Sequence, residues 1–153
     1  MKKLIIAGAV AVMASVVICQ PATAKTFKWS YQGDAAEMDP QARRETFTDA
    51  VISNVMESLV RYDGKLKIEP ELATDWKLMS PTVWRFNLRK GVKFHNGNPF
   101  NADDVITTYK RGTDERSPWK GALVAVKDIR KVDDFTIEVV THNPYPTLLR
   151  DLS

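Results

Sequence analysis

The side chains that could carry out chemistry are few and widely spaced. The sequence holds two histidines, His95 and His142, and one cysteine, Cys19. A structural zinc site takes four ligands, usually in closely spaced pairs, and neither histidine has such a neighbour. We therefore predict no metal site built from protein ligands alone, and no cofactor.

Two pairs of adjacent aspartates are the remaining candidates for catalysis. Neighbouring residues in a helix diverge by about 100°, so Asp103 and Asp104 do not converge on one substrate. Asp133 and Asp134 have the composition of a hairpin turn. No G-x-S-x-G nucleophile motif occurs. The sequence predicts a protein that is not an enzyme, with a secreted hydrolase as the alternative.

The first 24 residues have the pattern of a secretory signal peptide. Two lysines precede an apolar run from Leu4 to Ile18, which is shorter than the roughly 20 residues of a membrane-spanning helix. Small residues at Ala22 and Ala24 predict cleavage after Ala24. We therefore expect a signal peptide at 1–24 and a periplasmic mature chain.

The expected mature chain, 25–153, has the length of one domain and contains no cysteine once Cys19 is removed. It must be held together by packing rather than by disulfides. Loss of the two leader lysines lowers the net charge of +3 by two, so no strongly basic surface is implied. The local cluster of Arg85, Arg89, Lys90 and Lys93 is followed by several acidic residues, and we predict no binding of nucleic acid.

Hydrophobic periodicity predicts short strands with a few helices. Apolar residues that alternate or form short runs between turns predict strands over 26–31, 59–62, 66–68, 74–79, 83–89, 126–132 and 135–141. Helices are predicted over 46–60, 102–111 and 146–152. In the first of these, Phe47, Val51, Val55 and Leu59 recur every four residues and are expected to face a core.

Turn and capping residues connect these elements. Ser80-Pro81 and Asp133-Asp134 predict two hairpins, and Trp84, Phe86 and Leu88 are expected on one face of the first hairpin. Residues 96–99 predict a rigid turn. Asn101 is expected to cap the next helix and Gly112 to end it.

Five motifs occur together in this chain, and one alone would be weak. They are MDP at 38–40, VMESLVRYDG at 55–64, PELATDW at 70–76, WRFNLRKGVKFHNGNPFNADDV at 84–105 and DDFTIEVV at 133–140. In this order and spacing, the chain resembles the N-terminal portion of the family 5 extracytoplasmic solute-binding proteins, the peptide and nickel class that serves ABC importers.

The resemblance implies an α/β fold: the incomplete first lobe of a two-lobed periplasmic binding protein (type II-like), with short, mostly antiparallel strands and a few helices. Members of the family are several times longer, and their two lobes close on a ligand. We therefore expect 25–153 to be the N-terminal part of lobe I, without the hinge and second lobe. A truncated product without function is an alternative.

The resemblance also implies the function. We expect capture of a peptide-like or metal-chelate solute in the periplasm and its delivery to permease subunits in the inner membrane, by a protein that is a monomer. Which solute is bound stays open, because the residues that recognise peptide termini in the family lie mostly beyond Ser153.

Two segments are candidates for the ligand site. Relatives present polar groups to the ligand after the first strand, where this chain has Gln32, Gly33, Asp34 and Ala35. Gly33 permits close backbone approach, and Asp34 could meet a ligand amine. The alternative is a plain turn with a solvated aspartate.

The second candidate is the loop after the 102–111 helix. Nickel-type relatives carry an Arg and a Trp three residues apart that face the cleft, and Arg116 and Trp119 have this spacing. An arginine can hold a carboxylate by two parallel hydrogen bonds, and a tryptophan offers a flat face and an indole N–H. The alternative is that Trp119 fills the edge of the core while Arg116 stays in solvent.

Overall fold

The computed structural model describes residues 26, 28, 30, 32–43 and 45–153. The chain divides into two units after Gln32. The predicted signal peptide lies outside the described residues, as do Phe27, Trp29 and Tyr31, the alternating residues of the first predicted strand. The helices and strands of the described residues belong to the second unit, Gly33–Ser153.

The second unit contains three helices and six strands in its described residues. In chain order these are α2 (Thr46–Ile52), β1 (Val60–Tyr62), β2 (Ile68–Pro70), β3 (Ala73–Ser80), β4 (Val83–Leu88), α3 (Ala102–Gly112), β5 (Val126–Asp133), β6 (Thr136–Thr141) and α4 (Leu148–Asp151). None of the helices among these residues is both long and apolar enough to span a bilayer.

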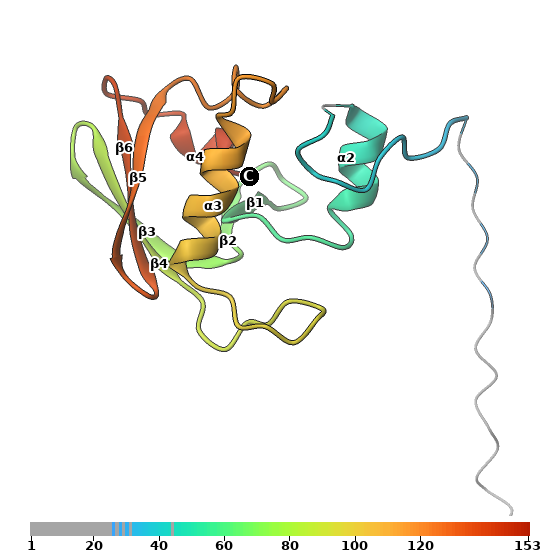
Figure 1. The fold of residues 1–153 in the computed structure, drawn as a ribbon, viewed down its shortest axis with the longest axis horizontal. Helices are drawn as coiled ribbons and strands as arrows, with labels where there is room; N and C mark the ends of the chain where they lie inside the picture. Colours follow the sequence, from blue (N-terminus) through green and yellow to red (C-terminus); the bar gives the residue numbers. More distant parts are fainter. Residues whose placement is uncertain (1–25, 27, 29, 31, 44) are drawn as a thin grey trace, which may run out of the picture. The chain divides into compact units, whose positions relative to one another are not determined.

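A four-stranded antiparallel sheet forms the centre of the unit, in the order β3-β4-β6-β5, and β1 pairs with β2 in a separate ribbon. Figure 1 shows α3 lying across one face of the larger sheet. Ser80 pairs with Val83, and Asp133 pairs with Thr136. Both predicted hairpins are therefore confirmed, as are the predominantly antiparallel strands.

The core lies between the larger sheet and α3. Phe86, Ile137 and Val139 are fully buried in the two central strands, and Ala102 and Val105 cover them from α3. Along β4 the side chains of Phe86 and Leu88 are buried while Asn87 is exposed. The alternation predicted from WRFNLR is therefore confirmed.

Asn101 caps α3 in a reciprocal arrangement. Its side chain accepts a hydrogen bond from the backbone N–H of Asp103 (2.7 Å), and the Asp104 carboxylate accepts one from the backbone N–H of Asn101 (2.8 Å). Acidic residues in the first turn also complement the helix dipole. The predicted helix start is confirmed.

We expect Asn101→Ala to lower the free energy of unfolding by about 1 kcal/mol, because the backbone N–H of Asp103 at the helix start loses its side-chain acceptor. Chemical denaturation monitored by circular dichroism measures the change. Thr107→Ala, on the exposed side of the same helix, is the matched control and should leave stability within about 0.5 kcal/mol. Equal losses in both variants would contradict the capping role.

The helix end predicted at Gly112 is confirmed, but glycine does not end the helix through a left-handed conformation. Gly112 is the last residue of α3, and Thr113 follows it as the cap in a right-handed conformation, with φ of −95°. A Cβ at residue 112 would lie 2.8 Å from Leu123 Cδ1 and 3.3 Å from Gln41 Nε2. Glycine is therefore placed here by close packing rather than by a left-handed backbone.

The helix predicted over 46–60 is shorter than expected. It ends at Ile52, and the side chains of Ser53 and Asn54 both bond the carbonyl of Ala50, at 2.9 and 2.7 Å. Such local bonds compete with continuation of a helix. The buried residues are Thr48 and Ile52, not the predicted stripe, because that pattern spans residues beyond the helix.

The strand predicted over 66–68 is shifted toward the C-terminus. Asp63 Oδ1 accepts hydrogen bonds from the N–H groups of Lys65 and Lys67, both at 2.8 Å. Leu66 consequently sits in a turn with φ of +61°, and β2 begins at Ile68 rather than at Leu66. The sequence predicts a turn at Asp63-Gly64, and the Asp63 carboxylate extends this turn as far as Lys67.

Candidate ligand-binding site

A polar groove of about 360 Å³ lies where the chain after Asp39 meets the end of α3 and the loop that follows. Its lining residues come from both segments and are Gln41, Ala42, Arg111, Asp114, Arg116, Ser117 and Pro118. Of the residues predicted to bind ligand, Arg116 belongs to this lining. We call this hollow the arginine groove.

Arg116 is positioned by Asp114 yet remains open to solvent. Its backbone N–H and its Nε–H both donate to Asp114 Oδ1, at 3.0 and 3.3 Å, and the side chain is 92% exposed. These two donors lower the pKa of Asp114, the backbone N–H more strongly. An exposed pair of this kind is weak, so an incoming carboxylate can replace Asp114 on the guanidinium.

Trp119 is partly buried and is not among the residues that line the arginine groove. Its backbone N–H donates to Ser117 Oγ at 3.2 Å, and its carbonyl accepts from Ala122 and Leu123. The indole Nε1 is shielded from solvent. The indole N–H is therefore not exposed to a ligand. A ligand could contact only the part of the Trp119 side chain that remains accessible.

The first candidate segment is exposed at 32–34 and partly buried at Ala35, and it is not joined to the groove. Asp34 Oδ1 accepts from the N–H of Ala35 at 2.8 Å, and the N–H of Ala36 donates to Thr48 Oγ1 at 3.2 Å, which ties the segment to α2. A Cβ on Gly33 would meet nothing within 4 Å. Among the hydrogen bonds and ion pairs of the described part of the chain, none links Asp34 to the arginine groove. Gln32, also exposed, belongs to the first unit.

Two residues of the groove were missed by sequence reasoning. Arg111 makes a two-pronged ion pair with Asp39, in which Nη1 donates to Oδ1 at 2.9 Å and Nη2 donates to Oδ2. Gln41 Nε2 donates to the carbonyl of Thr108 at 2.9 Å. Asp39 and Arg111 are far apart in the sequence. Apart from their opposite charges, no feature of the sequence indicated that they form a pair.

The ion pair has a defined pH dependence. The hydrogen bonds from Arg111 lower the pKa of Asp39 below its ordinary value, and Asp39 raises the pKa of Arg111. A carboxyl whose pKa is lower in the folded than in the unfolded chain stabilises the fold above the unfolded value. That contribution is lost as the pH falls through the lowered pKa of Asp39.

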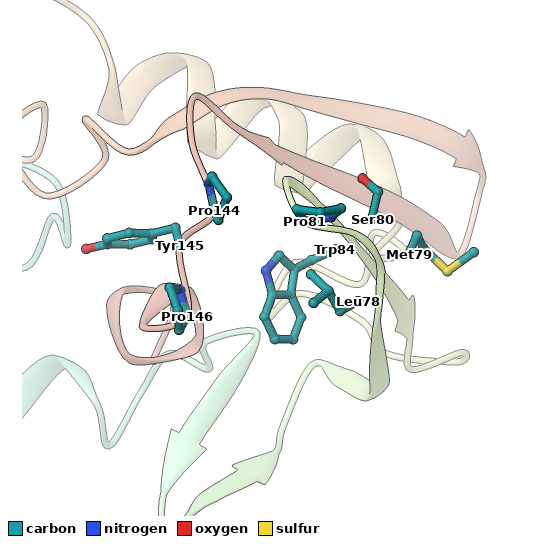
Figure 2. Close-up of a pocket in the computed structure, with 8 residues that line it drawn as sticks. All are labelled: Leu78, Met79, Ser80, Pro81, Trp84, Pro144, Tyr145 and Pro146. Carbon is teal, nitrogen blue, oxygen red and sulfur yellow. The ribbon is translucent and has the colours of Figure 1, made fainter.

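A second, apolar groove of about 550 Å³ lies elsewhere. It is lined by Leu78, Met79, Ser80, Pro81, Trp84, Pro144, Tyr145 and Pro146. Figure 2 shows the ring of Trp84 between Leu78 and the segment that carries Tyr145. The indole N–H of Trp84 is buried and finds no acceptor among the described residues. None of the residues predicted to bind ligand lies here.

Other charged groups belong to the surface. His95 and His142 are exposed, and the described residues contain no group of three or more His, Cys, Asp or Glu side chains placed to hold a metal ion. Within the basic cluster, Arg85 pairs with Glu138 at 2.6 Å and Arg89 pairs with Glu57. Two positive charges of that cluster are thus neutralised locally.

Residues 67–153 match the sequence profile described as "Bacterial extracellular solute-binding proteins, family 5 Middle". The chain belongs to this family. The match covers more than half of the chain and includes β2 to α4.

Proteins of known name support the same family. Di/tripeptide-binding protein 4 of Pseudomonas aeruginosa is 30% identical over 126 residues, which cover 69% of this chain and 24% of the relative. Heme-binding protein A of Haemophilus influenzae is 33% identical over 128 residues, which cover 70% of this chain and 23% of the relative.

Solved structures of family 5 type share the fold. NikZ from Campylobacter jejuni, in complex with Ni(L-His), has a TM-score of 0.71 and 27% identity, over 79% of this chain and 25% of its own. DppA from Helicobacter pylori, in complex with the peptide STSA, has a TM-score of 0.68 and 28% identity. The match covers 78% of this chain and 27% of the DppA chain. The predicted fold class, part of a two-lobed periplasmic binding protein, is confirmed. The chain spans about a quarter of the length of the relatives it matches.

Proposed function

We propose that this chain forms part of the substrate-binding component of an ABC importer. In this role it captures a peptide-like or metal-chelate solute in the periplasm and passes it to permease subunits in the inner membrane. The family match supports the role. Residues 1–24 serve as the export signal, and the folded protein acts as a monomer that performs no covalent chemistry.

The observation that carries this proposal is the exposed guanidinium of Arg116 at the edge of the arginine groove. A guanidinium binds a carboxylate through two parallel, charge-assisted hydrogen bonds. Peptides and amino-acid chelates of metals both carry a carboxylate, and the relatives named above include binders of each kind. The ligand carboxylate takes the place of Asp114 on Arg116, while an opposing lobe covers the ligand and excludes water.

A titration of residues 25–153 followed by NMR tests this assignment. Trialanine, added up to millimolar concentration, is expected to shift the signals of Arg116 Nε and of the backbone amides of 114–117 and Trp119. Trialanine amide, which lacks the terminal carboxylate, should shift them little. Arg116→Gln is expected to weaken the trialanine response about tenfold, which is the loss of one good charge-assisted contact.

Glu115→Gln is the matched control, because Glu115 is adjacent, 92% exposed and outside the groove lining. It should leave the response unchanged or slightly stronger. Equal shifts with trialanine and its amide, or an unaltered response in Arg116→Gln, would overturn the assignment of Arg116.

A further inference from the structure

We propose that Asp39 and Arg111 form a positioning pair that holds the 114–119 loop, and with it Arg116, against the 39–42 turn. This inference rests on the proposed function, because it concerns how the ligand-contacting arginine is held. Neither residue is needed to contact the ligand.

The pair joins the two segments that form the arginine groove. Arg111 lies in the last turn of α3, five residues before Arg116, and both arginines line the groove. In the 39–42 turn, whose Gln41 and Ala42 line the groove, Asp39 Oδ1 also accepts from the N–H of Gln41 at 3.0 Å, so the same carboxylate shapes this turn. One side chain therefore orders its own turn and anchors the helix end from which the loop departs.

Two further contacts act at the same place. Gln41 Nε2 donates to the carbonyl of Thr108, one turn before the helix end. Leu123, which follows the loop, packs over Gly112 so closely that a Cβ there would lie 2.8 Å from Leu123 Cδ1. Both ends of the loop are thus fixed next to the ion pair.

The exposure of the pair argues for positioning rather than for overall stability. The side chains of Arg111 and Asp39 are 57% and 32% exposed, and ion pairs near the surface contribute little to the free energy of unfolding. A two-pronged pair does, however, fix geometry, because both guanidinium N–H groups must face both carboxylate oxygens. Loss of the pair should release the loop locally and leave the sheet intact.

Hydrogen exchange measured by NMR on residues 25–153 tests the pair without any ligand. Asp39→Asn keeps a side-chain oxygen for the N–H of Gln41 but removes the charge. We expect the amide protons of Ser117, Lys120 and Leu123, which close the loop by backbone bonds, to exchange about fivefold faster or more. Amide protons of β4 and β6 should keep their rates, and Asp39→Glu should restore slow exchange in the loop.

Glu69→Gln is the matched control. It removes the ion pair between Arg61 and Glu69, whose side chains are 57% and 40% exposed, and it should leave the loop unchanged. If Asp39→Asn fails to fold, Arg111→Gln breaks the same pair from the other side. Unchanged loop exchange in both variants, or an equal increase throughout the sheet, overturns the proposal.

The trialanine titration separates this inference from the proposed function. Faster loop exchange together with a weaker trialanine response at Arg116 supports both. Faster loop exchange in a chain whose unsubstituted form shows no trialanine response supports the positioning pair and contradicts the proposed function. Unchanged exchange with an intact trialanine response overturns the positioning pair alone.

Discussion

Replacement of Phe86 by alanine is expected to lower the free energy of unfolding by about 3–5 kcal/mol, the usual cost of removing a fully buried aromatic side chain. Phe86 is completely buried in β4 and lies between Trp76 of β3 and Ile137 of β6. Its ring centroid is 6.4 Å from that of Trp76. Since small domains are stable by only about 5–15 kcal/mol, the variant should be close to the limit of folding.

Thermal and denaturant unfolding of residues 25–153 measures this loss, with an expected fall in Tm of roughly 10–20 °C. Phe94→Ala is the matched control, because Phe94 is 46% exposed and contacts Phe100 edge to face. It should cost less than about 1 kcal/mol. A similar loss in both variants would contradict the placement of the core between α3 and the sheet.

The second large effect concerns ligand affinity. Residues 25–153 alone are expected to bind a tripeptide at least about 100-fold more weakly than an intact relative, a difference of about 2.7 kcal/mol. A ligand pocket normally encloses 70–90% of its ligand's surface. The arginine groove is an open hollow, and the chain spans about a quarter of the relatives' length.

Isothermal titration calorimetry with trialanine measures this difference. Di/tripeptide-binding protein 4 of P. aeruginosa serves as the intact reference. Comparable affinity in the two proteins, within tenfold, would show that one wall is sufficient and would refute the idea that an opposing lobe completes the site.

The elements that sequence analysis predicted well are those whose signals are local. Asn101 caps α3 through a neighbour two residues away, and Asp133-Asp134 forms a turn between strands that alternate on both sides. Where a side chain redirected the backbone, the prediction failed. Asp63 prolonged a turn, and Ser53 with Asn54 ended α2 early, because each offered the backbone a competing hydrogen-bond partner.

The candidate site was only partly predictable, for a different reason. Arg116 was predicted from the resemblance to nickel-type relatives, and it lies in the groove. The partners that shape the groove, Asp39 and Gln41, contact α3 across a long stretch of intervening chain. No periodicity or motif signals a tertiary contact of this kind. The reason for Gly112 was also tertiary, since it depends on Leu123.

The strand order β3-β4-β6-β5 constrains how the chain folds. The hairpin of β3 and β4 is local, but the inner partner of β4 is β6, whose register pairs Phe86 with Ile137. Bringing β6 to β4 closes a long loop, and the chain loses conformational entropy before the contacts between these strands can stabilise it. While the chain emerges from N- to C-terminus, the inner edge of β4 has no strand partner until Thr136–Thr141 arrives. The interval between completion of the first hairpin and arrival of β6 is therefore the stage at which this chain is most exposed to aggregation.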